Sequence, residues 1–146
     1  MGLRTAVYYP ASNLRQDGKV NTRRKTILVV EDTDDIKELT ATVLRLDGCN
    51  VITARDGKEA LDMAVKCMPD LILMDLSMPV MNGFEATQRI LAIPALSTTP
   101  VIATSAHCDD EVWKRRAVEA GCVECVSKPL LPDTLERLVH RFFGGC

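Results

Sequence analysis

Five short apolar runs, separated by segments in which apolar residues recur with a helical period, constrain the fold of this chain more than any other feature. The first and third runs are apolar without alternation, which is typical of parallel strands that helices cover on both faces. Strands that alternate with helices predict an α/β fold with a parallel sheet. The five runs are residues 26–30, 50–53, 71–74, 101–104 and 123–126.

Each segment that follows a run predicts one helix. Four of them carry a clear apolar stripe: Ile36, Leu39, Val43 and Leu44; Leu61, Ala64, Val65 and Met68; Phe84, Thr87, Ile90 and Leu91; and Leu131, Leu135, Leu138, Val139 and Phe142. The remaining helix, fourth in chain order, is expected to begin around Asp109 and Asp110 and to stop at Gly121. Five strand–helix units without an internal repeat favour a doubly wound, three-layer α/β/α fold, for which the flavodoxin-like strand order 2-1-3-4-5 is common.

Length and charge limit the domain organisation. The 146 residues suffice for one domain, predicted over 26–146, and the polar residues 1–25 are interpreted as a flexible N-terminal extension. The net charge is -2, but residues 1–25 carry six basic groups and one acidic group, so the predicted domain carries -7. An acidic domain argues against direct nucleic-acid binding, which relies on clustered Lys and Arg.

No membrane insertion is expected, because no stretch approaches the roughly 20 apolar residues of a membrane span. Without a secretory signal, the chain is predicted to be cytoplasmic, and its six cysteines are predicted to be reduced thiols. Cys122 and Cys125 match a C-x-x-C pattern, but no second pair accompanies them. Cys125 is therefore interpreted as a small core residue.

Polar side chains follow four of the five predicted strands. Glu31 and Asp32 follow the first strand, Asp75 the third, Ser105 the fourth, and Lys128 comes shortly after the fifth. In an open parallel sheet these strand ends share one rim, where ligands bind. Three converging carboxylates need a hard cation with oxygen ligands, and Mg²⁺ fits best because it accepts one or two carboxylates with waters and a phosphate oxygen.

The same rim suits phosphoryl chemistry. Lys128 can pair with Asp75 at rest and with a phosphate oxygen afterwards, and the Ser105 hydroxyl can donate to that oxygen. Asp75 is then the nucleophile. Asp34 and Asp35 are interpreted as charges in the first turn of a helix rather than as metal ligands.

The chain resembles the receiver domains of two-component response regulators, over about residues 26–143. Four segments in order carry the resemblance: 27–32, 73–83, 100–106 and 127–129. It implies Asp75 as phosphoacceptor, Ser105 as switch hydroxyl, Lys128 as the essential lysine, and a Mg²⁺ site made by Glu31, Asp32, Asp75 and the backbone carbonyl of Ser77. It also implies a cis peptide bond between Lys128 and Pro129. Thr104 is a neighbouring hydroxyl, and Ser105 is preferred because Ala106 follows it.

One position departs from the family pattern. Many receivers carry an aromatic residue three positions before the lysine, where this chain has Cys125. Activation is therefore expected to use the Ser105 loop and the helix after it, or dimerisation to a homodimer, or contact with a partner. His107 is interpreted as a solvated loop residue, and Trp113 as either a partner contact or a partly packed aromatic.

These features predict a single-domain response regulator that receives a phosphoryl group on Asp75 from a histidine kinase or a histidine phosphotransfer protein. It acts as a switch and turns over no separate substrate, so it is not expected to be an enzyme in the usual sense. Three alternatives remain open: a receiver-like docking or dimerisation module without phosphotransfer, the terminal receiver of a hybrid histidine kinase, and an enzyme or electron carrier of similar topology.

Overall fold

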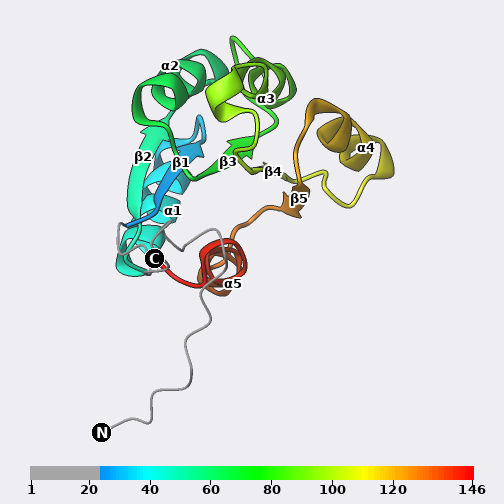
Figure 1. Ribbon diagram of the computed structural model, residues 1–146. Helices are drawn as coiled ribbons and strands as arrows, with labels where there is room; N and C mark the ends of the chain where they lie inside the picture. Colours follow the sequence, from blue (N-terminus) through cyan, green and yellow to red (C-terminus); the bar gives the residue numbers. More distant parts are fainter. Residues whose placement is uncertain (1–23) are drawn as a thin grey trace, which may run out of the picture.

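A computed structural model describes residues 24–146 of the chain (Figure 1). Those residues form one five-stranded parallel sheet in the order β2-β1-β3-β4-β5, as predicted. The predicted N-terminal extension falls outside the described residues, apart from its last two. The strands are β1 Thr26–Val30, β2 Asn50–Ala54, β3 Leu71–Asp75, β4 Val101–Ser105 and β5 Glu124–Ser127.

Five α-helices cover the two faces of the sheet. Helices α1 and α5 pack against each other on one face, and α2, α3 and α4 cover the other face, so the predicted three layers are present (Figure 1). No helix within residues 24–146 is both long and apolar enough to cross a membrane. The helices are α1 Asp34–Leu46, α2 Gly57–Cys67, α3 Gly83–Leu91, α4 Glu111–Ala120 and α5 Pro132–Phe143, and a short 3-10 helix, η2 Pro94–Leu96, follows α3.

The central strands are apolar without alternation because both of their faces lie in a core. In β1, Leu28 and Val30 belong to the core under α2, α3 and α4, whereas Ile27 and Val29 belong to the core under α1 and α5. Successive side chains of a strand point to opposite faces, so a strand between two helical layers needs apolar residues at every position. The buried strands place their polar ends at one rim of the sheet.

Local sequence sets where the helices near that rim begin and end. The Asp110 side chain accepts a hydrogen bond from the Val112 N–H at 2.8 Å and caps α4, and the Asn82 side chain accepts one from the Glu85 N–H at 3.0 Å and caps α3. Gly121 ends α4 with φ of 110°, a left-handed conformation that favours glycine. The predicted bounds of α4 are confirmed.

The predicted apolar stripe of α1 is wrong at two positions. Leu44 is buried as expected, but Ile36 is 43% exposed and Leu39 is 64% exposed. Thr40 and Ala41 are the side chains that turn towards the sheet instead. The first turns of α1 lie beside the rim, where no other helix among residues 24–146 covers them, so an apolar side chain there need not be buried.

The prediction of reduced thiols is wrong for four of the six cysteines. Disulfides join Cys49 to Cys146 and Cys108 to Cys125, with Cα–Cα separations of 5.0 Å and 5.5 Å. These separations suit a disulfide, but they are set by the fold, because the bonded partners are 97 and 17 residues apart in sequence. Apolar sequence neighbours therefore gave no information about pairing.

Cys125 also differs from its interpretation as a core residue. It is only partly buried, and its sulfur is bonded to Cys108 in the loop between β4 and α4. The other cysteine of the C-x-x-C pattern, Cys122, is a buried free thiol whose sulfur lies 3.8 Å from the hydroxyl of Thr87. The two cysteines of the pattern are not bonded to each other.

Candidate functional site

Three acidic side chains meet at the carboxyl ends of β1 and β3, which are neighbouring strands. Glu31 follows β1 directly and Asp75 is the last residue of β3, and both are buried, at 4% and 2% exposure. Asp32 is exposed beside them. One carboxylate oxygen from each residue lies within 4.8 Å of the other two. The structure thus brings together the three carboxylates that the sequence predicted to converge.

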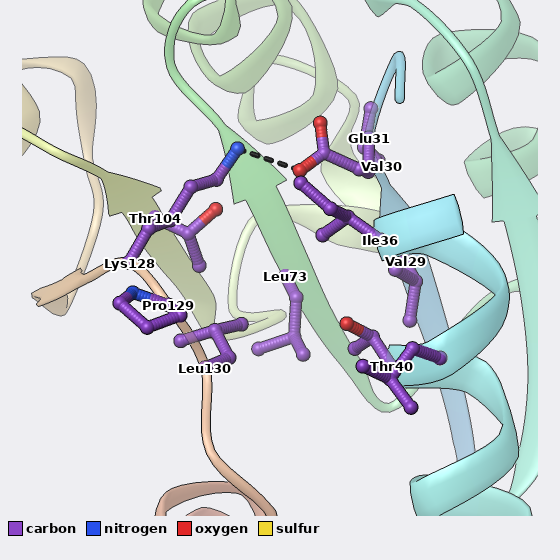
Figure 2. Close-up of a pocket in the computed structure, with 11 residues that line it drawn as sticks. Val29, Val30, Glu31, Ile36, Thr40, Leu73, Thr104, Lys128, Pro129 and Leu130 are labelled. Atoms are coloured by element: carbon purple, nitrogen blue, oxygen red, sulfur yellow. Dashed lines mark hydrogen bonds and ion pairs between the residues drawn. The ribbon is translucent and has the colours of Figure 1, made fainter. Parts of the chain in front are cut away.

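Lys128 enters this acidic cluster from the loop after β5. Its Nζ lies 2.6 Å from Oε1 of Glu31 and 3.1 Å from Oδ2 of Asp75, and the former ion pair is drawn in Figure 2. The backbone supports this position, because the Lys128 N–H donates to the carbonyl of Ser105 at 3.0 Å. The predicted cis peptide bond between Lys128 and Pro129 is present. One ammonium therefore faces two buried carboxylates.

Burial and charge shift the protonation of this pair in defined directions. Burial raises the pKa of the Glu31 carboxyl, and the neighbouring Asp75 raises that pKa further, against the opposing effect of Lys128. Burial lowers the pKa of the Lys128 ammonium, but its interactions with Glu31 and Asp75 outweigh burial, so the net pKa is raised. Lys128 therefore stays charged, and negative charge remains in excess at the rim.

Two backbone features fix the position of Asp75. The Ser77 N–H donates to Oδ1 of Asp75 at 3.0 Å, so each carboxylate oxygen has its own partner. Gly83 begins α3, and a Cβ at that position would collide with the carbonyl oxygen of Asp75. Only glycine allows the start of α3 to approach the end of β3 this closely. The Asp75 carboxylate is thereby held in one orientation at the rim.

Ser105 ends β4 at the same rim and is buried, at 2% exposure. Its Oγ accepts a hydrogen bond from the His107 N–H at 3.0 Å. Thr104, the other candidate hydroxyl, pairs in register with Asp75 across the strands, but its side chain lines a cavity under the rim (Figure 2). Ser105 thus ends β4 at the rim, and the loop that leads into α4 begins directly after it.

The donor set fits the divalent cation that the sequence predicted. The described residues gather carboxylates of Glu31, Asp32 and Asp75, with no His or Cys in the cluster. Oxygen donors of this kind suit Mg²⁺, whereas Zn²⁺ favours nitrogen and sulfur. Because Lys128 neutralises only part of the acidic charge, a cation beside these oxygens is electrostatically favoured. Ser77 adjoins the cluster through its backbone, and ligation by its carbonyl stays a prediction.

A cavity of about 320 Å³ lies directly beneath this cluster, and nothing in the sequence predicted it. Its walls are apolar, and Glu31 and Lys128 close one end (Figure 2). The exposed Ile36 and Leu39 of α1 form part of the wall, which explains why two apolar residues could lie outside the core. The cavity is also lined by Val29, Val30, Thr40, Leu73, Thr104, Pro129 and Leu130.

The start of α4 carries a small aromatic stack near the Ser105 loop. The rings of His107 and Trp113 lie 4.8 Å apart, and those of Trp113 and Phe84 lie 5.5 Å apart. His107 is exposed, as interpreted from the sequence, and Trp113 is partly buried. The guanidinium of Arg116 lies 4.1 Å from the centre of the Phe84 ring. Trp113 is therefore packed by its neighbours on one side.

The sequence of the chain matches those of known signalling proteins. The response regulator receiver domain matches residues 27–140. The polar-differentiation response regulator DivK of Brucella anthropi is 36% identical over 123 residues, which cover 82% of this chain and 97% of that protein. The chain also matches protein-glutamate methylesterases, such as that of Haloarcula marismortui, of whose length it covers 27%.

Solved structures show the same relationship. The chemotaxis protein CheY4 of Vibrio cholerae superposes with a TM-score of 0.79 at 30% identity, over 83% of this chain and 100% of that one. The receiver domain of the sensor histidine kinase PA1611 from Pseudomonas aeruginosa, which has a magnesium ion in its active site cleft, superposes with a TM-score of 0.76 at 30% identity, over 84% and 99%. The chain belongs to the response regulator receiver domain family.

Proposed function

We propose that this receiver is a phosphorylation-dependent switch in which Asp75 accepts a phosphoryl group from the phosphohistidine of a histidine kinase or a histidine phosphotransfer protein. The observation that carries the proposal is the double contact of Lys128 with Glu31 and Asp75 at a buried rim. A structural aspartate at a strand end needs no such surroundings. An acceptor does need them, because its product carries more negative charge than the carboxylate it replaces.

The transfer itself requires little from the protein beyond position and charge. An oxygen of Asp75 attacks the phosphorus atom, the phosphorus–nitrogen bond breaks, and the imidazole nitrogen keeps the electron pair and takes up a proton. Ser77 and Lys128 hold the two carboxylate oxygens in place before the attack. The Lys128 ammonium then pairs with an oxygen of the phosphoryl group, and the Ser105 hydroxyl donates to the same oxygen.

Mg²⁺ would be held by Glu31, Asp32, Asp75 and the backbone carbonyl of Ser77. When bound, it supplies positive charge beside the transferring phosphoryl group. The related receiver of PA1611 contains magnesium in its active site cleft, and the three carboxylates of this chain offer the oxygen donors that Mg²⁺ prefers. Support for the metal therefore comes from donor chemistry as well as from family membership.

The biological output proposed is a change in affinity for a partner protein, in the cytoplasm where phosphohistidine donors act. The chain is proposed to assist its own phosphorylation and dephosphorylation and to turn over no other substrate. Ser105 links the site to the loop before α4, since its hydroxyl oxygen accepts a hydrogen bond from the His107 N–H. Movement of that hydroxyl to a phosphoryl group would shift the loop.

Intact-mass measurement after incubation with acetyl phosphate and Mg²⁺ tests the proposal. The chain should gain one phosphoryl group, Asp75→Asn should gain none, and Asp62→Asn, which alters an exposed aspartate on α2, should behave as the unaltered chain. Chelation of Mg²⁺ should abolish the gain. A phosphoryl group that persists in Asp75→Asn would mean that another residue is the acceptor. No gain in the unaltered chain would instead favour a docking module without phosphotransfer.

A further inference from the structure

The disulfide between Cys108 and Cys125 lies between two residues of the candidate site along the chain. Cys108 comes three residues after Ser105, and Cys125 comes three residues before Lys128. The bond therefore closes a loop that contains all of α4. It fastens the segment before α4, residues 106–110, to β5. A second link, from the Ser127 hydroxyl to Asp109 at 3.4 Å, joins the same two segments.

The backbone of His107 connects the disulfide to the Ser105 hydroxyl. The His107 N–H donates to Ser105 Oγ at 3.0 Å, and the His107 carbonyl accepts from the Asp110 N–H at 2.9 Å. Cys108 is the residue directly after His107 and is itself only 2% exposed. If the Ser105 hydroxyl turns towards a group on Asp75, the His107 N–H must follow or lose its partner. In the first case the backbone next to Cys108 moves with it, and a bond that ties Cys108 to β5 opposes that movement.

We propose that Cys108 and Cys125 form a reversible thiol–disulfide site that controls this movement. In the disulfide form the loop is tied to β5 and the Ser105 hydroxyl stays on His107. In the dithiol form the loop can shift when Asp75 is phosphorylated. The coupling to phosphorylation rests on the proposed function above, whereas the redox reaction of the two sulfurs does not.

The reaction balances as an ordinary thiol–disulfide exchange. A thiolate of a small thiol or of a dithiol oxidoreductase attacks the sulfur of Cys125, because Cys125 is partly exposed and Cys108 is buried. The Cys108–Cys125 bond breaks, and Cys108 leaves as a thiolate and takes up a proton. A second thiol then resolves the mixed disulfide, so two thiols become one external disulfide and Cys108 and Cys125 gain two electrons and two protons. An external disulfide reverses the sequence.

The location of the other disulfide supports this assignment by contrast. Cys49 and Cys146 join the loop before β2 to the end of the chain, beside α5. That bond closes a loop over residues 49–146, which leaves β1 and α1 outside, and neither of its cysteines is a residue of the candidate site. In a reducing cytoplasm, disulfides are chiefly transient or regulatory. Reduction of the Cys108–Cys125 bond would thus act directly on the loop between β4 and α4. Reduction of the Cys49–Cys146 bond would instead lower the free energy of unfolding of the domain.

The test uses the full chain carrying Cys49→Ser, Cys67→Ser and Cys146→Ser, so that the candidate pair and the buried Cys122 are the cysteines that remain. The protein is equilibrated with mixtures of reduced and oxidised glutathione, and alkylation with peptide mass mapping reports the bond between Cys108 and Cys125. Hydrogen exchange of residues 106–120 is then followed with and without acetyl phosphate and Mg²⁺. The matched variant carries Cys108→Ser and Cys125→Ser, so that it can never form this disulfide and is called the locked-open variant. If either variant does not fold, the same measurements are made on the unaltered chain.

We expect the bond to form and break across the glutathione series, with exchange in residues 106–110 faster by roughly tenfold or more in the dithiol form. Phosphorylation should alter that exchange in the dithiol form and in the locked-open variant, but not in the disulfide form. A bond that never breaks, or exchange that is the same in both redox forms, overturns the inference. If Asp75 takes up no phosphoryl group, the proposed function fails. The thiol–disulfide site is then still tested, because hydrogen exchange of the disulfide and dithiol forms can be compared without acetyl phosphate.

Discussion

The Lys128 ammonium lies 3.1 Å from Oδ2 of Asp75, so the candidate acceptor has a positive counter-charge beside it before a phosphoryl group arrives. The same ammonium lies 2.6 Å from Glu31, and the two carboxylates share it. A single cation between two buried acids leaves the rim short of positive charge. The shortage explains why the site should bind a metal ion and why loss of the lysine should be costly.

Replacement of Lys128 by Ala should lower the free energy of unfolding of the metal-free protein by about 3 kcal/mol, because two buried carboxylates lose their partner. Lys114→Ala, which removes an exposed ion pair with Glu111, should change it by less than about 0.5 kcal/mol. Urea denaturation of both variants measures the difference. Equal effects would mean that the Lys128 pairs contribute no more than surface charges.

Addition of Mg²⁺ at about 100 times its Kd should raise the free energy of unfolding by about 2.7 kcal/mol, because the ion binds the folded chain alone. Asp32→Asn should weaken the affinity for Mg²⁺ measured by calorimetry. Asp35→Asn, which neutralises a nearby exposed charge in the first turn of α1, should leave it nearly unchanged. Equal losses in both variants would show that bulk charge, rather than ligation, attracts the ion.

Alkaline pH should destabilise the fold through Cys122. Burial raises the pKa of its thiol, against a smaller opposing effect of Thr87, so the folded chain holds this proton more tightly than the unfolded chain does. The stabilisation is complete below the unfolded pKa of about 8.5 and is lost as pH rises through the folded pKa. The free energy of unfolding of Cys122→Ala, measured by denaturation at a series of pH values, should therefore fall less steeply above pH about 8.5 than that of the unaltered chain. Parallel curves would contradict this role for Cys122.

Loss of the disulfide between Cys49 and Cys146 should lower the free energy of unfolding by about 2–5 kcal/mol, because the bond closes nearly the whole domain in the unfolded chain. Cys146→Ser made in the Cys108→Ser and Cys125→Ser background isolates this bond. Dithiothreitol should destabilise that background to the same extent and should have no effect once Cys146 is replaced. A dithiothreitol effect that persists without Cys146 would point to another cause.

The fold and the acidic rim could be predicted because both follow from local pattern. Apolar runs gave the strands, and the carboxyl ends of parallel strands share one edge, so Glu31, Asp75 and Lys128 had to approach each other once the order was right. The glycine at Gly83 contributes in a way that periodicity does not reveal. Its role depends on how closely α3 approaches the backbone of Asp75.

The disulfides and the cavity could not be predicted, because both depend on distances between segments far apart in sequence. Cys108 and Cys125 meet only after α4 has folded back along the sheet, and the apolar neighbours of Cys125 are equally compatible with a free thiol. Ile36 and Leu39 fit a helical stripe, but they lie where the sheet ends and a cavity begins. Periodicity identifies the face of a helix and does not show how far the covered surface extends.

Borohydride trapping tests the acceptor role of Asp75 most directly, because it reduces an aspartyl phosphate to homoserine at the residue that carried the phosphoryl group. After treatment with acetyl phosphate and Mg²⁺, peptide mass mapping should find homoserine at position 75 and nowhere else. It should find none when Mg²⁺ is chelated. Homoserine at another aspartate, or none under any condition, would contradict the account.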